Sequence, residues 1–257
     1  MKDHFGRNIN YLRLSITDRC NLRCRYCMPH GVEFTPHEQI LTYEEFLRVA
    51  RAAVHLGITR FKITGGEPLV RKGVTDFIVA LKRLPGVEEV TLTTNGVRLA
   101  ELVPALKAAG VDGVNISLDA LSPEVYRAIA GRDELEATRR GIRAALDGGL
   151  PVKLNCVPQP GLNETELLPL AALARQLPLQ VRFIEMMPIG CGAAQPSLSG
   201  REVLARLRAQ WPELAPLPAA QAAGFGDGPA VYYSAPGWQG SVGLIMAVHG
   251  KFCASCN

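Results

Sequence analysis

The chain has 257 residues, of which 47% are hydrophobic, enough for one large globular domain or a domain with an appendage. Its net charge is only +4, so its overall charge does not by itself indicate a nucleic-acid binder. No charged leader followed by an apolar run opens the chain, and no apolar run approaches the roughly 18 residues that span a bilayer. We therefore expect a soluble, cytoplasmic protein that binds neither nucleic acid nor a membrane.

Short β-branched segments alternate with longer helical ones over the first part of the chain. The predicted strands cover residues 11–17, 60–64, 90–93, 113–117, 152–157 and 181–186. Two helix starts have a capping-box pattern, Thr42 with Glu45 and Asn163 with Glu166, and further helices are predicted at 98–109 and 122–147. Six βα units in succession predict an α/β protein with a parallel sheet, either open and doubly wound or curved into a partial barrel.

This alternation ends near residue 190. Residues 190–228 are rich in Ala, Pro, Gln and Gly, and we expect one helix at 199–210 within a linker. Segments 231–234 and 241–246 then predict two strands of a small sheet that closes the open side of the barrel. The chain is thereby divided into a core domain, residues 1–189, and a C-terminal extension, residues 190–257.

Three cysteines, Cys20, Cys24 and Cys27, follow the first predicted strand with Cys-x3-Cys-x2-Cys spacing. Structural zinc sites and iron–sulfur sites held only by protein normally take four ligands. Three closely spaced thiolates can hold three corners of a [4Fe–4S] cluster, which leaves one iron open to another ligand. The alternatives are a zinc site completed by His30 or His37, or ordinary buried thiols.

The chain has seven cysteines in all, an odd number, and a second pair stands at Cys253 and Cys256. This clustering favours metal binding in a reducing compartment over a disulfide framework. Cys156 and Cys191 lie outside both clusters and are interpreted as packing or bystander thiols.

A second motif, Ile-Thr-Gly-Gly-Glu-Pro at residues 63–68, ends the second predicted strand. Paired glycines let the backbone approach a ligand closely, and Glu67 offers a carboxylate to a cationic group. Alone, such a turn often marks only a tight loop. Polar side chains also follow the third and fourth strands, where helix capping and turn formation are the alternative roles: Thr93, Thr94, Asn95, Asn115, Ser117 and Asp119.

Together, the three-cysteine loop and the Gly-Gly-Glu-Pro turn resemble the radical S-adenosylmethionine (SAM) superfamily. The resemblance becomes more specific through the segments at 11–24, 94–96, 115–119, 182–187, 228–233 and 252–257. Over residues 10–257 the chain resembles the GTP 3′,8-cyclase (MoaA) family of molybdenum cofactor biosynthesis. That family implies an incomplete (β/α)6 TIM-type barrel with a small C-terminal extension carrying a second [4Fe–4S] cluster.

The resemblance also implies roles for individual residues. Cys20, Cys24 and Cys27 would bind the cluster that cleaves SAM. The residues expected to contact SAM are Tyr26, Gly65, Gly66, Glu67, Ser117 and Met187, and those expected to contact GTP are Arg13, Lys62, Thr93, Lys153 and Arg182. The four basic residues lie in separate predicted strands, so a barrel could bring them together on one triphosphate. A single cation at such a place would more often be solvated or structural.

The activity that the family implies is that of a lyase. A 5′-deoxyadenosyl radical removes hydrogen from C3′ of GTP, the ribose radical attacks C8, and reduction gives 3′,8-cyclo-7,8-dihydro-GTP. The implied partners are a reductant protein, a downstream cyclic pyranopterin monophosphate synthase and a second copy in a homodimer. Two other hypotheses remain: a radical SAM enzyme acting on another substrate, and a non-catalytic truncated homologue that binds cluster and SAM.

The chain departs from the family pattern at two places. Lys62 replaces an arginine, which keeps the charge but loses bidentate phosphate geometry. Cys253 and Cys256 match two ligands of the second cluster, but the third ligand is absent from the sequence. We expect a fragment, a short homologue with an altered second site, or a site completed by His249; a metal-free tail is the alternative.

Overall fold

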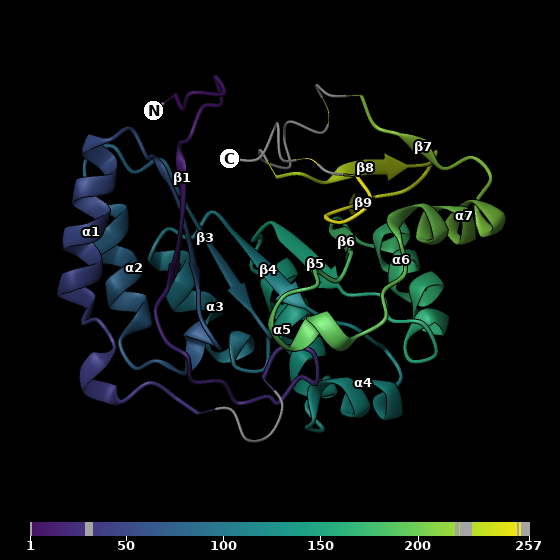
Figure 1. Cartoon of the computed structure of the whole chain (residues 1–257), viewed down its shortest axis with the longest axis horizontal. Helices are drawn as coiled ribbons and strands as arrows, with labels where there is room; N and C mark the ends of the chain where they lie inside the picture. Colours follow the sequence, from purple (N-terminus) through teal and green to yellow (C-terminus); the bar gives the residue numbers. More distant parts are fainter. Residues whose placement is uncertain (1, 29–32, 219–220, 222–227, 251, 253–257) are drawn as a thin grey trace.

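The computed structural model describes residues 2–28, 33–218, 221, 228–250 and 252. In these residues the strands form one open sheet in the order β1-β2-β3-β4-β5-β6-β9-β8-β7 (Figure 1). The strands are β1 (Tyr11–Ser15), β2 (Arg60–Thr64), β3 (Glu89–Thr94), β4 (Gly113–Ser117), β5 (Val152–Cys156), β6 (Gln180–Ile184), β7 (Ala215–Pro216), β8 (Val231–Ser234) and β9 (Ser241–Ile245). Neighbours from β1 to β6 pair in parallel, as expected.

The helices between the strands cover one face of the sheet and its edges. They are α1 (Tyr43–His55), α2 (Val74–Lys82), α3 (Leu99–Ala108), α4 (Pro123–Ala130), α5 (Leu135–Asp147), α6 (Leu167–Gln176) and α7 (Gly200–Gln210). Short 3-10 turns occupy His37–Gln39, Pro68–Val70, Glu164–Glu166 and Gly190–Ala194. Among the described residues no helix has the length and apolar character needed to cross a membrane.

The two faces of the sheet differ in character because strand side chains alternate. In β2, Phe61 and Ile63 are fully buried and belong to the apolar core under the helices. Lys62 lies between them and therefore points to the opposite face, which we call the inner face. Cross-strand register places polar residues of the other strands on the same inner face: Arg13, Thr93, Asn115, Lys153, Asn155 and Arg182.

The observed fold confirms the predicted α/β architecture with a parallel, unclosed sheet, and it corrects the C-terminal strands. β8 and β9 form, but not as a separate small sheet. β9 pairs in parallel with β6, β8 pairs antiparallel with β9, and β7 continues beyond them. In Figure 1 these strands lie at the opposite end of the molecule from α1. The extension therefore lengthens the sheet of the core.

The predicted helices need three corrections. Residues 122–147 form two helices, because Gly131 adopts a φ of +67° and ends α4. α2 was not predicted. The capping box at Thr42 forms: the Thr42 side chain accepts from the Glu45 amide, and the Glu45 side chain accepts from the Thr42 amide. Asn163, in contrast, has no side-chain capping hydrogen bond and is followed by a 3-10 turn. Its fully buried side chain instead donates to Asp119 O and Val157 O and accepts from the amide of Gln159.

Candidate active site

The three cysteines of the loop after β1 line one cavity of about 200 Å³ at the carboxyl ends of β1 to β4. Its walls also include Tyr26, Gly65, Gly66, Thr93, Thr94, Asn95, Ser117 and Asp119. Within the described part of the chain, no three His, Cys, Asp or Glu side chains are grouped as ligands of a single metal ion. The alternative of a zinc site completed by His37 stays untested, and His30 lies outside the described residues.

Backbone hydrogen bonds fix the cysteine loop to the end of α4. The amides of Arg23 and Arg25 donate to Ala130 O at 2.9 Å and to Ile129 O at 3.0 Å. A side chain at Gly131 would bring its Cβ within 2.8 Å of Arg23 O, so glycine is required there for contact as well as for conformation. The helix break at Gly131 is thereby part of the site.

The paired glycines after β2 lie against the backbone that leads into the cysteine loop. The amide of Gly66 donates to Thr17 O at 2.6 Å, and the amide of Glu67 donates to Arg19 O at 2.7 Å. A Cβ at Gly65 would lie 2.4 Å from Thr17 O, and one at Gly66 2.4 Å from Arg19 O. Both glycines line the cavity, and their lack of side chains lets the two loops pack together.

Glu67 is 1% exposed, and its carboxylate accepts three hydrogen bonds from its own chain. The donors are the Leu69 amide at 3.0 Å, Thr94 Oγ1 at 2.7 Å and the Asn95 amide at 2.6 Å. Burial raises the pKa of Glu67, and these hydrogen bonds oppose the rise. The carboxylate thus joins the ends of β2 and β3. Its predicted contact with SAM stays a prediction.

Asn95, positioned by Glu67, faces the first cysteine. Its side-chain amide donates to Asn21 Oδ1 at 2.8 Å and lies 3.9 Å from Cys20 Sγ. The amide of Leu22 also donates to Cys20 Sγ, at 3.3 Å. Donors of this kind stabilise a thiolate. Asn95 was noted in the sequence only as a polar residue at a strand end.

Tyr26 is held by a carboxylate that the site prediction omitted. Its hydroxyl donates to Asp119 Oδ2 at 2.7 Å, and Asp119 Oδ1 accepts from the Val157 amide at 2.7 Å. Burial raises the pKa of Asp119 to about 6, against the effect of these two hydrogen bonds. The cysteine loop is thereby fastened to the ends of β4 and β5.

The remaining residues predicted to contact SAM differ in placement. Ser117, at the end of β4, lines the cavity. Met187 is 49% exposed and is not among the described residues that line it. Cys253 and Cys256 lie outside the described residues.

Deeper on the inner face, the four predicted basic residues gather into one group. Arg13 of β1 is the cross-strand partner of Lys62 in β2. Burial, followed by the charges of Arg182, Lys153 and Arg13, lowers the pKa of Lys62 to about 7. Burial and Arg182 likewise lower the pKa of Lys153 to about 8. We call these four residues the cation cluster; their mutual repulsion makes it a favourable place for an anion.

Arg182 is held by hydrogen bonds to residues of several strands. Its Nε donates to Asn155 Oδ1 at 2.9 Å, and one terminal nitrogen donates to Asn115 Oδ1 at 2.8 Å. The hydroxyl of Tyr232 forms a further hydrogen bond with it. Sequence reasoning missed these three partners as site residues; alternation along the strands is the one signal that could have placed Asn155 on the inner face.

The cavity and the cation cluster adjoin each other. Thr93, which lines the cavity, is the cross-strand partner of Asn115, and Ser117, also in the cavity wall, is the partner of Asn155. Both asparagines hold Arg182. The cavity wall and the surroundings of Arg182 therefore lie on neighbouring positions of β3, β4 and β5.

Comparison with known proteins agrees with this geometry. Residues 14–174 match the family model of the radical SAM superfamily, and residues 179–257 match that of Molybdenum Cofactor Synthesis C. Among solved structures, SuiB of Streptococcus suis bound to S-adenosylmethionine has a TM-score of 0.62 at 18% identity, covering 79% of this chain and 47% of that one. A structure of anSMEcpe with bound AdoMet has a TM-score of 0.59, also at 18% identity, covering 78% of this chain and 59% of that one. At such identities the likeness concerns the fold.

Sequence relatives are more specific. The GTP 3′,8-cyclase of Moorella thermoacetica is 49% identical over 100% of this chain and 79% of its own length. That of Geobacter sulfurreducens is 47% identical over 99% and 78%. Molybdenum cofactor biosynthesis protein 1 of Homo sapiens is 44% identical over 100% of this chain and 40% of its own length. The chain therefore belongs to the radical SAM superfamily and, within it, to the family of the GTP 3′,8-cyclases.

Membership implies an iron–sulfur cluster and SAM, and the residues present fit both. Three thiols line one cavity, and glycines that could not carry a Cβ form part of its wall. Burial raises the pKa of each of the three thiols, so the sulfurs would lose their protons as iron binds.

Proposed function

We propose that this chain is a radical SAM GTP 3′,8-cyclase, a lyase that converts GTP into 3′,8-cyclo-7,8-dihydro-GTP in the first step of molybdenum cofactor biosynthesis. The observation that carries this proposal is the cation cluster, which adjoins the cysteine cavity through Thr93 and Ser117. The relatives bearing this name, at 45–49% identity, support it.

In this proposal Cys20, Cys24 and Cys27 hold one [4Fe–4S] cluster, and the cavity beside them takes SAM. Tyr26, Gly65, Gly66 and Ser117 line that cavity, and Met187 would close over it. When bound, the cluster and SAM supply the 5′-deoxyadenosyl radical that abstracts hydrogen. The chain's own contribution is to orient the reactants: Asp119 fixes the Tyr26 ring, and Glu67 fixes the strand ends that face the cysteines.

The cation cluster would receive the triphosphate of GTP. Arg182 is preset by Asn115 and Asn155, so it need not reorganise on binding. Lys62 and Lys153, whose pKa values burial lowers, would regain full charge beside phosphate. Thr93, which lines the cavity and pairs with Asn115, would then hold the ribose close to the cavity, and C3′ would face the radical source.

Other parts of the proposal go beyond the site. The protein would work in the cytoplasm with a reductant protein, would pass its product to a cyclic pyranopterin monophosphate synthase, and would form a homodimer. Residues 1–189 would be the core and 190–257 the extension, with Cys253 and Cys256 in a second cluster. Iron analysis separates one cluster from two, since the reconstituted chain would hold about four or about eight iron atoms.

The test is an anaerobic assay of the reconstituted protein with reductant and SAM, with and without GTP. Mass spectrometry should detect 5′-deoxyadenosine and a cyclised nucleotide, both dependent on GTP. Deoxyadenosine without a nucleotide product would point to another substrate, and neither product would favour a non-catalytic homologue. An Arg182→Met variant should lose the nucleotide product while retaining the visible absorbance of the cluster, because it lies outside the cysteine loop.

A further inference from the structure

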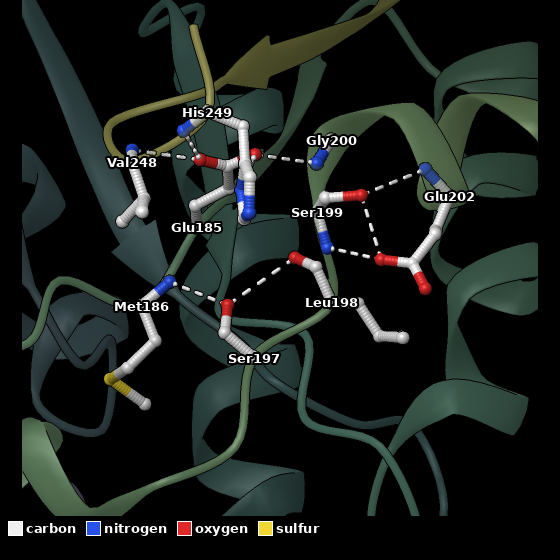
Figure 2. A network of polar contacts seen from close by, with 9 residues as sticks. All are labelled: Glu185, Met186, Ser197, Leu198, Ser199, Gly200, Glu202, Val248 and His249. Atoms are coloured by element: carbon white, nitrogen blue, oxygen red, sulfur yellow. Dashed lines mark hydrogen bonds and ion pairs between the residues drawn. The ribbon is translucent and has the colours of Figure 1, made fainter. Parts of the chain in front are cut away.

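The carboxylate of Glu185, directly after β6, is the centre of a polar network away from the cysteine cavity (Figure 2). Its side chain is 2% exposed. Oε1 accepts from the Gly200 amide at 2.7 Å and lies 3.2 Å from His249 Nδ1. Oε2 accepts from the amides of Val248 at 2.8 Å and His249 at 3.0 Å. All these donors belong to the C-terminal part of the chain, so one carboxylate joins the end of β6 to α7 and to the turn after β9.

The carboxylate stays ionised in this setting. Burial alone would raise the pKa of Glu185, but the hydrogen bonds from Gly200, His249 and Val248 lower it below its ordinary value. The Gly200 amide also belongs to the first turn of α7, where the helix dipole favours a negative charge. Replacing this carboxylate with an amide would leave one oxygen as an acceptor and place an NH2 group against the backbone donors of the other, which is costly.

Close packing surrounds the network. A Cβ at Gly200 would lie 2.5 Å from Met246 Cγ, and one at Gly250 would lie 2.7 Å from Met246 Cβ. Met246 is thus held between two glycines, one at the start of α7 and one in the turn after β9. The junction therefore has one close-packed arrangement, in which the direction of the chain after β9 is fixed.

Strand register connects this junction to the cation cluster. Ile184 pairs with Ile245 immediately before Glu185, and two residues earlier Arg182 pairs with Gly243. Gly243 in turn pairs with Tyr232 of β8. A Cβ at Gly243 would lie 2.9 Å from the Tyr232 ring and 3.0 Å from Arg182 Cγ. The Tyr232 ring therefore passes over Gly243 to reach Arg182. The position of β9 thus determines where the Tyr232 side chain lies relative to Arg182.

We propose that Glu185 is a positioning residue for the anion site, because it locks the end of β9 to β6 and so holds Tyr232 on Arg182. This rests on the proposed function, since it takes the cation cluster to be the triphosphate site. Glu185 touches neither the cations nor the cavity. It acts through β9 and Tyr232, and the nucleotide site is therefore completed by residues of the C-terminal extension.

The test compares Glu185→Gln with Glu202→Gln in the full chain after cluster reconstitution. Glu202 caps the same helix through hydrogen bonds with Ser199, and among the described residues its only link to the turn after β9 is the electrostatic effect of His249. The same chemical change there is therefore a matched control for the hydrogen bonds of Glu185. Hydrogen exchange should accelerate about tenfold or more at residues 246–250 and at Gly200 in the first variant only, and exchange in β1 to β4 should not change.

The second readout is the affinity for inorganic triphosphate and for GTP, measured by calorimetry. Glu185→Gln and Tyr232→Phe should each weaken binding about tenfold, and the double variant should lose little more, because both changes remove the same contact to Arg182. Glu202→Gln should bind like the wild type.

Three results would overturn the proposal: unchanged exchange in Glu185→Gln, faster exchange with wild-type triphosphate affinity, or losses that multiply in the double variant. If the wild-type protein bound neither GTP nor triphosphate, the proposed function itself would be refuted, and the link to an anion site with it. That result is obtained before any variant is made and is thus distinct from the first three.

Discussion

At the scale of single residues, the cation cluster should increase the affinity for an anion and lower the stability of the ligand-free fold. Lys62 is largely buried beside three other cations on the inner face, and its pKa falls to about 7 although the charge of Glu89 opposes the fall. Fixed like charges in a partly buried place disfavour the folded state and favour an anionic ligand. Substituting one cation should therefore change stability and anion affinity in opposite directions.

Lys62→Met should therefore stabilise the ligand-free protein and weaken triphosphate binding. We expect a gain of about 1 kcal/mol, or about 2–4 °C in melting temperature, with a loss of about tenfold or more in triphosphate affinity. Thermal unfolding and calorimetry measure the two quantities. The exposed Lys72 provides the control, and Lys72→Met should change neither. A less stable Lys62→Met protein with unchanged affinity would contradict this account.

Triphosphate affinity should also fall as pH rises from about 6 to 9. A lysine with a lowered pKa is charged below that pKa and neutral above it, and the pKa values here are about 7 for Lys62 and about 8 for Lys153. The ligand-free protein should behave in the opposite way. Above pH 7 the unfolded chain binds more protons at these lysines than the folded one, so their contribution to stability rises with pH. Calorimetric titrations across this range, in buffers of different ionisation enthalpy, should show proton uptake on binding.

The residues of the site were predictable from sequence where they belong to a compact motif. The three cysteines, Gly65 and Gly66 line one cavity, and the cluster and SAM contacts that the resemblance implies for them stay predictions. Asp119 and Tyr232 were not predicted as site residues, because their roles depend on partners about a hundred and about fifty residues away. Such contacts are set by sheet order and register, which local patterns do not encode.

At the scale of elements, the predicted strands and the helices α3 and α7 match the structure closely, whereas the prediction for residues 122–147 does not. β2 and β4 both match the predicted ranges. In β2, buried residues alternate with half-buried ones and give a two-residue period, whereas the first four residues of β4 are all buried. Residues 122–147 were read as one helix because the apolar spacing continues past Gly131. The positive φ of Gly131 and its contact with Arg23 depend on the tertiary structure, which the local sequence pattern does not show. β9 was predicted as a strand, but its pairing partner β6 lies across a long insertion.

The packing of the β2 turn against the cysteine loop gives a prediction for these elements. Gly66→Ala would place a methyl group 2.4 Å from Arg19 O and 2.5 Å from Asp18 O, so the loop would have to move. We expect iron incorporation to fall at least several-fold, because the three thiols would lose their common cavity. Iron and sulfide analysis after reconstitution measures this.

Gly228→Ala is a suitable control, since a Cβ there meets nothing within 4 Å. It should bind iron as the wild type does. Full iron content in Gly66→Ala would show that the two loops can separate without harm to the site.

At the scale of the whole molecule, the extension belongs to the same sheet and core as the first six strands. Val242 and Leu244 of β9 are almost fully buried, and β9 pairs with β6 along five residues. The proposed division at residue 189 therefore separates segments that share one apolar core.

A protein ending at residue 189 should not unfold cooperatively. Without β9, the buried face of β6 loses its cover and its backbone groups lose their partners. Chemical denaturation followed by circular dichroism should show a broad transition at lower denaturant concentration than in the full chain. A sharp transition of similar midpoint would establish residues 1–189 as an independent domain.

The parallel pairing of β6 with β9 also has a consequence for synthesis. When β6 leaves the ribosome, its partner is still about 60 residues away, which at about 5–20 residues per second is a delay of about 3 to 12 s. During that interval one side of β6 offers unpaired amides and carbonyls beside a row of apolar side chains, the arrangement that recruits strands from other chains. Slow translation of residues 185–231, through rare codons or a shortage of amino acids, would prolong this exposure and divert nascent chains into aggregates. In the finished protein this side of β6 is fully paired.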